Sequence, residues 1–345
     1  MSAPGRRRRV RPGNRQAGIE EVASMAGVST TTVSRVINDV ATVSEDNRQR
    51  VLEAIKRLKY RPNPSAQRLA AGKSNTIGLI IPRYEGIFHS YYAMQVIQGI
   101  GITAERVNSD LLLHITDGKS LPSGVNGLLF VDIYGCEDLL DRAIDEEMPL
   151  VVLNHYLKDL PVSCVAIDNE SAAERVVDYL VRLGHRDIAT ITGDLKTQAG
   201  LERFDGFVKA MKAHQLTLKD SHIRFGDFGL PSARTATEAL LALGDRPTAI
   251  FVASDDMALE AIHVALGKGV RVPEELSVIG FDDNPVSVHG RIPLTTVRQP
   301  LSKMGQMALD ILFQHMSGKK QNPTKLLLPT ELIERQSCRQ TWLER

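Results

Sequence analysis

The pattern of apolar and polar positions divides the chain into two parts with different periodicities. Between Gly18 and Tyr60 apolar residues recur at helical spacing, and this predicts three short helices. Three helices of this length suffice for a minimal core. The positions predicted to face that core are Ile19, Val22, Ala23 and Ala26 in the first helix, Val33, Val36 and Ile37 in the second, and Val51, Leu52, Ile55 and Leu58 in the third.

A turn signal separates the first two helices. Gly27 can supply a sharp turn, and Ser29 is a suitable N-cap for the second helix. This arrangement predicts a helix-turn-helix, whose second helix inserts its N-terminal half into the DNA major groove. Arg35 on that helix can pair bidentately with guanine, and threonine can hydrogen-bond base edges or offer its methyl group to thymine. Ser44 is the predicted cap of the third helix.

A short basic segment, 63–74, follows the predicted DNA reader. Pro64 near its start and Gly72 near its end favour about two turns of helix. So short a helix is marginal in water, so it needs DNA or a second copy of the chain to form. Leu69 is suited to wedging between base steps from the minor groove. The alternative is an ordinary flexible linker.

From Thr76 onward apolar strands alternate with amphipathic helices. This pattern predicts parallel sheets covered on both faces, arranged as two doubly wound lobes. A ligand cleft is then expected between the lobes, at the carboxyl ends of the strands. The predicted strands are 77–81, 111–115, 127–131, 150–153, 165–168, 187–192, 249–253 and 276–280, and the predicted helices are 94–107, 137–146, 172–183, 202–214 and 256–267.

One connection in the first lobe is unusually short. Only residues 116–126 join two predicted parallel strands, whereas such a crossover needs about a dozen or more residues. We therefore expect no helix there, and one face of the first sheet thinly covered.

Charge is distributed unevenly although the whole chain is close to neutral. The net charge is +1 over 345 residues, but residues 1–73 carry 15 Lys and Arg against 6 Asp and Glu. The basic excess therefore coincides with the predicted DNA reader. Residues 1–17, rich in Arg, Pro and Gly, are expected to form a disordered basic arm. That arm either attracts phosphate without specificity or is a solvated tail without a role.

Other composition features narrow the class of protein. No apolar run is long enough to cross a membrane, and the N-terminus lacks the apolar core of a signal peptide. Three widely spaced cysteines suggest neither a disulfide framework nor a zinc site. We expect a reduced cytoplasmic protein with no metal or cofactor.

The ordered motifs of the first 80 residues resemble those of the LacI/GalR family of transcriptional regulators. The matching segments are 26–38, Val43-Ser44, 50–55, Tyr60-Arg-Pro-Asn63 and 75–80. The resemblance implies an all-α helix-turn-helix DNA-binding domain (18–62), a hinge helix or linker (63–74) and an α/β two-lobed periplasmic-binding-protein-like domain (75–345). It further implies that Thr30, Thr31 and Arg35 read bases, that Thr32, Ser34, Asn38 and Ser44 contact phosphates or position the helix, and that Leu69 is a minor-groove lever. Gly18 departs from the family, which usually has a capping residue such as Thr there.

The second half resembles the same family through several further motifs, including Leu183-Gly-His-Arg186, 272–283 and 293–300. Family members cross between lobes three times, and the crossings are expected near 168–170, 283–285 and Glu331. Lobe 1 is then about 75–168 and 285–330, and lobe 2 about 169–284 and 331–345.

The same comparison of positions predicts an effector site in the cleft. The predicted contacts are Phe88, His89, Asn154, His155, Arg203, Phe228, Ser254 and Asp282. Phe228 would serve as an apolar platform, while Asp282, Asn154 and Arg203 are planar partners for paired hydroxyls or a carboxylate, which favours a sugar or sugar acid. His155 and Ser254 differ from the residues common in the family. His89 and His155 could equally belong to the core, and we expect the Asp255-Asp256 pair to cap a helix.

These observations favour a sequence-specific transcriptional regulator, a homodimer on a near-palindromic double-stranded operator, controlled by a small metabolite. The alternatives are a solute-binding protein and a carbohydrate-processing enzyme. The DNA reader and the lack of an export signal oppose the first. The sequence shows no nucleophile–base pair, metal spacing or phosphate loop for the second.

Overall fold

The computed structural model describes residues 18–37, 40, 42–58, 60, 75–83, 90–317 and 322–341. The chain divides into two compact units, residues 1–74 and 75–345. The predicted basic arm and hinge segment lie outside the described residues. The same holds for four predicted contact residues, Asn38, Leu69, Phe88 and His89.

The first unit contains three helices, as predicted. They are α1 (Ile19–Ala26), α2 (Thr30–Ile37) and α3 (Glu45–Leu58), and their inner faces form one apolar cluster around Val22, Val33 and Val51. Gly27 ends α1 in the left-handed region at φ 64°, a conformation that favours glycine. The Arg50 guanidinium of α3 donates to the Gly27 carbonyl at 3.2 Å, so the turn is also held by a side chain from the third helix.

The predicted inner face of α3 was wrong at one position. Leu52 is 52% exposed, whereas Ala54, which the sequence analysis did not select, is buried. Val51 and Ala54 are spaced i, i+3, and Ile55 and Leu58 continue that stripe as partly buried residues. Leu52 lies about 100° around the helix from Val51, which places it at the edge of the stripe and toward solvent.

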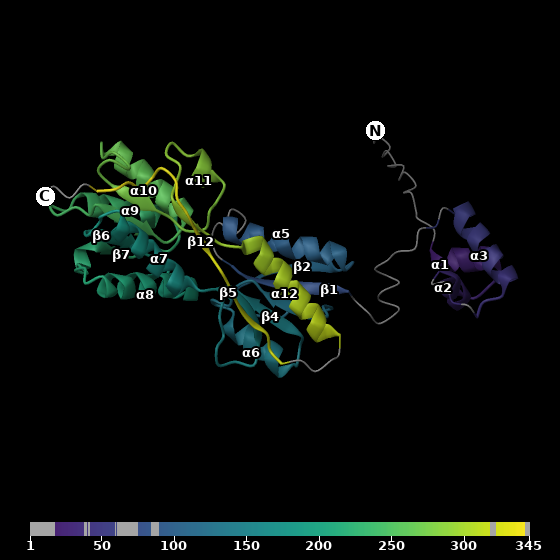
Figure 1. Cartoon of the computed structure of the whole chain (residues 1–345). Coiled ribbons are helices and arrows are strands. Elements are labelled where there is room, and N and C mark those ends of the chain that lie inside the picture. Colours follow the sequence, from purple (N-terminus) through teal and green to yellow (C-terminus); the bar gives the residue numbers. More distant parts are fainter. Residues whose placement is uncertain are drawn as a thin grey trace, which may run out of the picture. The chain divides into compact units, whose positions relative to one another are not determined.

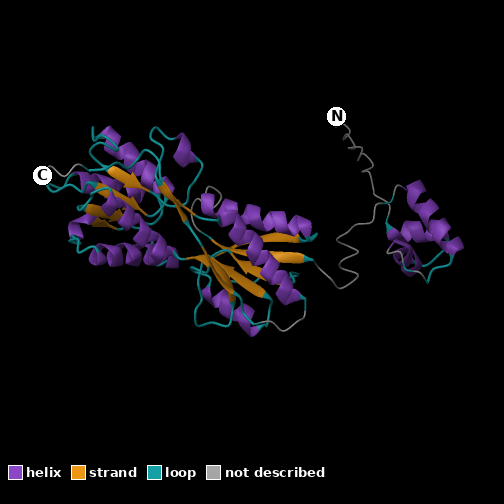
Figure 2. Ribbon diagram, in the orientation of Figure 1, coloured by secondary structure: helices purple, strands orange, loops and turns teal. Residues whose placement is uncertain are grey.

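Lobe 1 of the second unit is built on a six-stranded parallel sheet of order β11-β5-β4-β3-β1-β2 (Figure 1). Helices α5 and α12 pack on one face, in the larger apolar cluster, and α6 packs on the other. Figure 2 shows the strands of this sheet flanked by helices on both sides. The elements are β1 (Thr76–Pro82), α5 (Tyr91–Arg106), β2 (Asp110–Thr116), β3 (Gly127–Phe130), α6 (Glu137–Asp145), β4 (Leu150–Leu153), β5 (Ser163–Ile167), α12 (Leu301–Met316) and β11 (Lys325–Leu328).

The short connection between β2 and β3 contains no helix, which confirms the expectation from its length. Leu121 and Val125 of this connection pack against the apolar cluster on the α6 face, so the loop itself covers part of the sheet. The cover of that face is incomplete, because Leu112 of the edge strand β2, which lies on it, is 39% exposed.

Lobe 2 has a four-stranded parallel sheet of order β7-β6-β8-β9. Helices α7 and α8 pack together, as do α9 and α10. Four elements of this lobe, η2, β7, α9 and α11, had not been predicted. The elements are α7 (Asn169–Arg182), β6 (Ile188–Ile191), α8 (Gln198–Ala213), the 3-10 turn η2 (Asp220–His222), β7 (Ile223–Arg224), α9 (Leu230–Leu241), β8 (Ala249–Val252), α10 (Asp255–Gly267), β9 (Ser277–Ile279) and α11 (Val286–His289).

The chain passes between the lobes at three places, one of which differs from the prediction. The first lies between β5 and α7, as expected. Residues 286–295, expected in lobe 1, instead pack on lobe 2: Leu294 joins its apolar cluster, and the Gly280 N–H donates to the Thr295 carbonyl at 3.0 Å. The remaining crossings are β10 (Thr296–Arg298) and β12 (Glu331–Ile333), which pair antiparallel.

None of the helices in the described part of the chain combines the length and the apolar character needed to cross a membrane.

Candidate functional site

The described residues that the sequence predicts to contact DNA lie on α2, except Ser44. Thr30, Thr31 and Arg35 are exposed, as is Ser44 before α3, whereas Thr32 and Ser34 are half-buried. Ser29 caps α2, because its hydroxyl accepts a hydrogen bond from the Thr32 N–H at 3.1 Å. The core of the unit therefore leaves the predicted base-reading side chains available to a partner.

The predicted cleft between the lobes would have one wall in lobe 1, where β3 and β4 end. Asp132, which follows β3, accepts from the Asn154 side-chain amide at 3.3 Å. One oxygen of the same carboxylate accepts from the Ile133 and Tyr134 backbone N–H groups and lies 3.8 Å from His155 Nδ1. Asn154 Oδ1 and His155 Nδ1 are buried and have no hydrogen-bond partner. Both atoms are therefore left to a ligand or a water.

The second wall belongs to lobe 2 and centres on Arg203 of α8. Its guanidinium donates to Asn169 Oδ1 at 2.9 Å and to the Ala253 carbonyl at 2.7 Å. It also stacks 3.6 Å from the centre of the Phe281 ring. Burial lowers the pKa of Arg203, and the negative charge of Asp282 opposes that effect. A guanidinium with this many contacts is rigidly placed.

Asp282 follows β9 at φ 126°, a left-handed backbone conformation that is rare for a residue with a side chain. Its carboxylate accepts from Gln299 Nε2 at 2.6 Å and lies 4.0 Å from Arg203. Burial raises the pKa of Asp282, while Arg203 and the Gln299 hydrogen bond act in the opposite direction. Gln299 Oε1 is buried without a partner. Gln299 follows β10, so this pair adjoins a crossing between the lobes.

A second buried carboxylate, Asp255, links α10 to the same crossing. It accepts from the Asn284 N–H at 2.7 Å and from the Thr296 hydroxyl of β10. Burial, followed by the charge of Asp282, raises the pKa of Asp255 to about 8. The expectation that the Asp255-Asp256 pair caps α10 was wrong in detail, because the cap is Ser254, whose hydroxyl accepts from the Met257 N–H at 3.4 Å.

Two further predicted contacts have structural partners. The Ser254 hydroxyl accepts the capping hydrogen bond described above. Phe228 lies in the left-handed region at φ 66° and packs over the backbone that follows β6. A methyl group at Gly193 would come within 2.1 Å of the Phe228 ring, so glycine is needed for this close approach.

The two walls face each other in this structure. The Tyr156 N–H of lobe 1 donates to Gln198 Oε1 of α8 at 2.7 Å. Burial, followed by the charges of Asp283 and Asp282, raises the pKa of Tyr91 on α5, which places that phenol beside the lobe 2 carboxylates. Burial raises the pKa of Glu202 on α8, and the Asn169 hydrogen bond, followed by the nearby His155 of lobe 1, opposes that effect.

Several of these residues were not predicted from the sequence. Asp132, Asn169, Gln198 and Gln299 are examples. Asp132 follows a buried strand as Asn154 does, so the rule that selected Asn154 could have found it. Gln299 lies within a motif already quoted for the family resemblance. In the described ranges, no group of three or more His, Cys, Asp or Glu residues is arranged to hold a metal ion.

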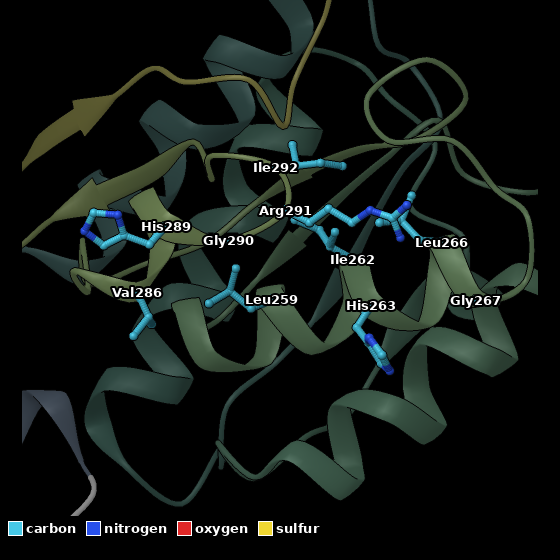
Figure 3. Close-up of a pocket in the computed structure, with 10 residues that line it drawn as sticks. All are labelled: Leu259, Ile262, His263, Leu266, Gly267, Val286, His289, Gly290, Arg291 and Ile292. Atoms are coloured by element: carbon cyan, nitrogen blue, oxygen red, sulfur yellow. The ribbon is translucent and has the colours of Figure 1, made fainter.

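A separate groove lies outside the cleft, on α10 and the loop that follows α11 (Figure 3). Its volume is about 590 Å³ and its lining is mostly apolar. It contains none of the predicted effector contacts. The lining residues are Leu259, Ile262, His263, Leu266, Gly267, Val286, His289, Gly290, Arg291 and Ile292.

Comparison with known proteins assigns both units. Residues 18–63 match the model of the bacterial regulatory proteins of the lacI family, and residues 177–338 match a periplasmic binding protein-like domain. The chain is 32% identical to a probable HTH-type transcriptional repressor, ExuR of Bacillus subtilis (strain 168), over 330 residues, which span 93% of this chain and 98% of the relative. It is 33% identical to the HTH-type transcriptional regulator CelR of Thermobifida fusca, over 94% and 98% of the two chains.

Two solved structures of regulators are similar to nearly the whole chain. A lac repressor dimer bound to operator and an anti-inducer is 28% identical, with a TM-score of 0.81 over 94% of this chain and 100% of the other. A CelR–cellobiose complex is 31% identical, with a TM-score of 0.70 over 93% and 99%. The chain therefore belongs to the LacI family of bacterial regulatory proteins and is a DNA-binding transcriptional regulator.

Proposed function

We propose that the cleft binds a small polyhydroxylated metabolite and that its occupancy sets the operator affinity of the N-terminal reader. The observation that carries this proposal is the Arg203–Asp282 pair, in which Arg203 is buried and Asp282 is 16% exposed, next to a crossing between the lobes. A ligand that touches this pair touches the segment about which the lobes must move. It can shift the lobe arrangement only by its differential affinity for the two arrangements.

On the DNA side, the exposed face of α2 supports the assignments made from the sequence. Thr30, Thr31 and Arg35 read base edges, and Thr32, Ser34 and Ser44 contact phosphates or position the helix. A second copy of the chain supplies the other reader, so that a two-fold dimer meets a near-palindromic operator. The dimeric lac repressor on its operator, which covers 94% of this chain, supports that arrangement.

A change in operator affinity on ligand binding is what separates this proposal from a plain solute-binding protein. The CelR–cellobiose complex supports a carbohydrate in the cleft, since its chain is similar to this one over both lobes. The test is a thermal-shift screen of sugars on the full chain, followed by operator titration with each ligand that stabilises it. Stabilisation without any change in operator affinity would reduce the function to solute binding.

An enzyme is the second alternative, and we expect no turnover. The cleft carboxylates Asp132 and Asp282 each hold a carboxamide, Asn154 and Gln299 respectively. This arrangement suits hydrogen bonding to a ligand that is released without chemical change. Mass spectrometry of a bound ligand after prolonged incubation tests the point, and a new product that depends on Asp282 would overturn it.

A further inference from the structure

The same pair of side chains, a carboxylate and a carboxamide, occurs on both walls of the predicted cleft. In lobe 1 the Asn154 side-chain amide donates to Asp132, and in lobe 2 the Gln299 side-chain amide donates to Asp282. In each case the amide oxygen is buried and has no partner. Two carboxylate–carboxamide pairs are therefore present, one within lobe 1 and one where Asp282 of lobe 2 meets the crossing that contains β10.

Each carboxylate fixes the direction of its amide. A rotated Asn154 or Gln299 would place its carbonyl oxygen against a carboxylate, where two acceptors repel. The amino group of each amide consequently stays on the carboxylate, and the oxygen is the atom offered to a ligand. Both walls then present hydrogen-bond acceptors, and a ligand must bring donors to satisfy them.

The charged side chains that are exposed to a ligand are mainly carboxylates, so the site is also biased toward negative charge. The side chains of Asp132 and Asp282 are 22% and 16% exposed, whereas that of Arg203 is only 6% exposed. Arg203 is already engaged by Asn169, Ala253 and Phe281.

We propose that the cleft selects an uncharged ligand with several hydroxyl groups and rejects analogues that carry a carboxylate. This inference rests on the proposed function, and it narrows the ligand from a sugar or sugar acid to a neutral sugar. A hydroxyl can donate to an orphaned amide oxygen and accept from a neighbouring donor such as His155. A carboxylate supplies no donor, and it meets like charge on both walls.

The test compares neutral sugars with their own acids on the full chain at pH 7.5. The probes are the pairs glucose and glucuronate, galactose and galacturonate, mannose and mannuronate, and cellobiose and cellobionate, with binding measured by isothermal titration calorimetry. At least one neutral sugar binds, and its acid binds roughly 100-fold more weakly, because juxtaposed like charges cost several kcal/mol. An acid that binds within threefold of its neutral partner, or more tightly, overturns the inference and leaves the proposed function intact. If no member of any pair binds, the polyhydroxylated ligand itself is wrong, and both proposals fall together.

Removing one carboxylate charge tests the mechanism. In Asp132→Asn the new amide keeps an oxygen for the Ile133 and Tyr134 N–H groups, and its amino group faces Asn154. Asn154 must then rotate to accept from it, so that an amino group replaces the oxygen presented to the ligand. The acid-to-neutral affinity ratio should rise at least tenfold. The control is Asp141→Asn, on the exposed surface of α6, which should leave the ratio unchanged.

A second aspartate-to-asparagine variant, on the other wall, keeps the test informative if the first variant fails to fold. Asp282→Asn should rotate Gln299 by the same logic and raise the same ratio. Circular dichroism and thermal unfolding establish which variants fold. If both variants fold and neither ratio moves, the carboxylate–carboxamide pairs do not set the selectivity.

Discussion

Replacing Asp255 with asparagine should change how the stability of the large domain depends on pH. Asp255 is fully buried and lies between the Asn284 N–H and the Thr296 hydroxyl. An asparagine fits both partners, because its oxygen can accept from Asn284 and its amino group can donate to the Thr296 oxygen. Asp255→Asn thus reproduces the protonated form of this carboxyl group without any possibility of ionising.

The magnitude follows from the raised pKa of Asp255. Burial and the charge of Asp282 raise it from an ordinary 3.8 to about 8, so between about pH 4 and pH 8 the folded protein holds a proton that the unfolded chain has released. Stability is therefore greatest below about pH 4 and is lost as pH rises toward 8. In that window the loss is about 1.4 kcal/mol per pH unit, or about 3 kcal/mol between pH 5 and pH 7.

The assay is differential scanning calorimetry of the full chain at pH 5, 6, 7 and 8. We expect the variant and the parent to be closest at pH 5. Between pH 5 and pH 7 the advantage of the variant in unfolding temperature should grow by roughly 6–12 °C, since 1 kcal/mol corresponds to about 2–4 °C in a domain of this size. Asp141→Asn, with its exposed side chain, should track the parent throughout. A difference between Asp255→Asn and the parent that stays constant with pH would refute the assigned ionisation.

Three further changes probe the DNA-binding half. Arg35→Ala should weaken operator binding by about 1–3 kcal/mol while the large domain stays folded, and equal operator affinity at matched salt would remove Arg35 from base reading. Leu69→Ala, in the segment outside the described residues, should weaken binding and reduce DNA bending together, and an unchanged bend in a gel-phasing assay would contradict the wedge. Gly27→Ala should destabilise the first unit by roughly 1 kcal/mol because of its left-handed φ, and unchanged thermal unfolding of that unit would show that the turn relaxes.

Periodic features of this molecule could be predicted from the sequence. The three helices of the first unit, most of the parallel strands and the helix-free connection at 117–126 follow from spacing, apolar runs and length. Other elements were missed, among them the helices α9 and α12 and the strands β7 and β11. The two-residue strand β7 is too short to show a pattern, and Leu52 was assigned to a stripe that Ala54 fills.

The site was harder to predict because its polar residues lie after strands, where spacing carries no information. Arg203 and Asp282 were identified through family motifs, and Asn154 because it follows a predicted strand. Asp132 and Gln299 became apparent only when the fold placed each carboxylate beside a carboxamide. The place where the chain crosses back to lobe 1 was missed for a similar reason. The packing of Leu294 on lobe 2 depends on tertiary contacts that no local pattern encodes.

The most direct test of the account is an operator titration in which cleft occupancy is the only variable. The full chain is titrated onto an operator selected from a random DNA pool, with and without the neutral sugar that binds it, alongside Asp282→Ala. We predict that the sugar changes the operator affinity of the parent at least fivefold and leaves that of Asp282→Ala unchanged. An inducer would leave the variant permanently bound to operator, and a corepressor would leave it unable to bind. A parent whose operator affinity ignores a saturating sugar, or a variant that responds as the parent does, would contradict the account.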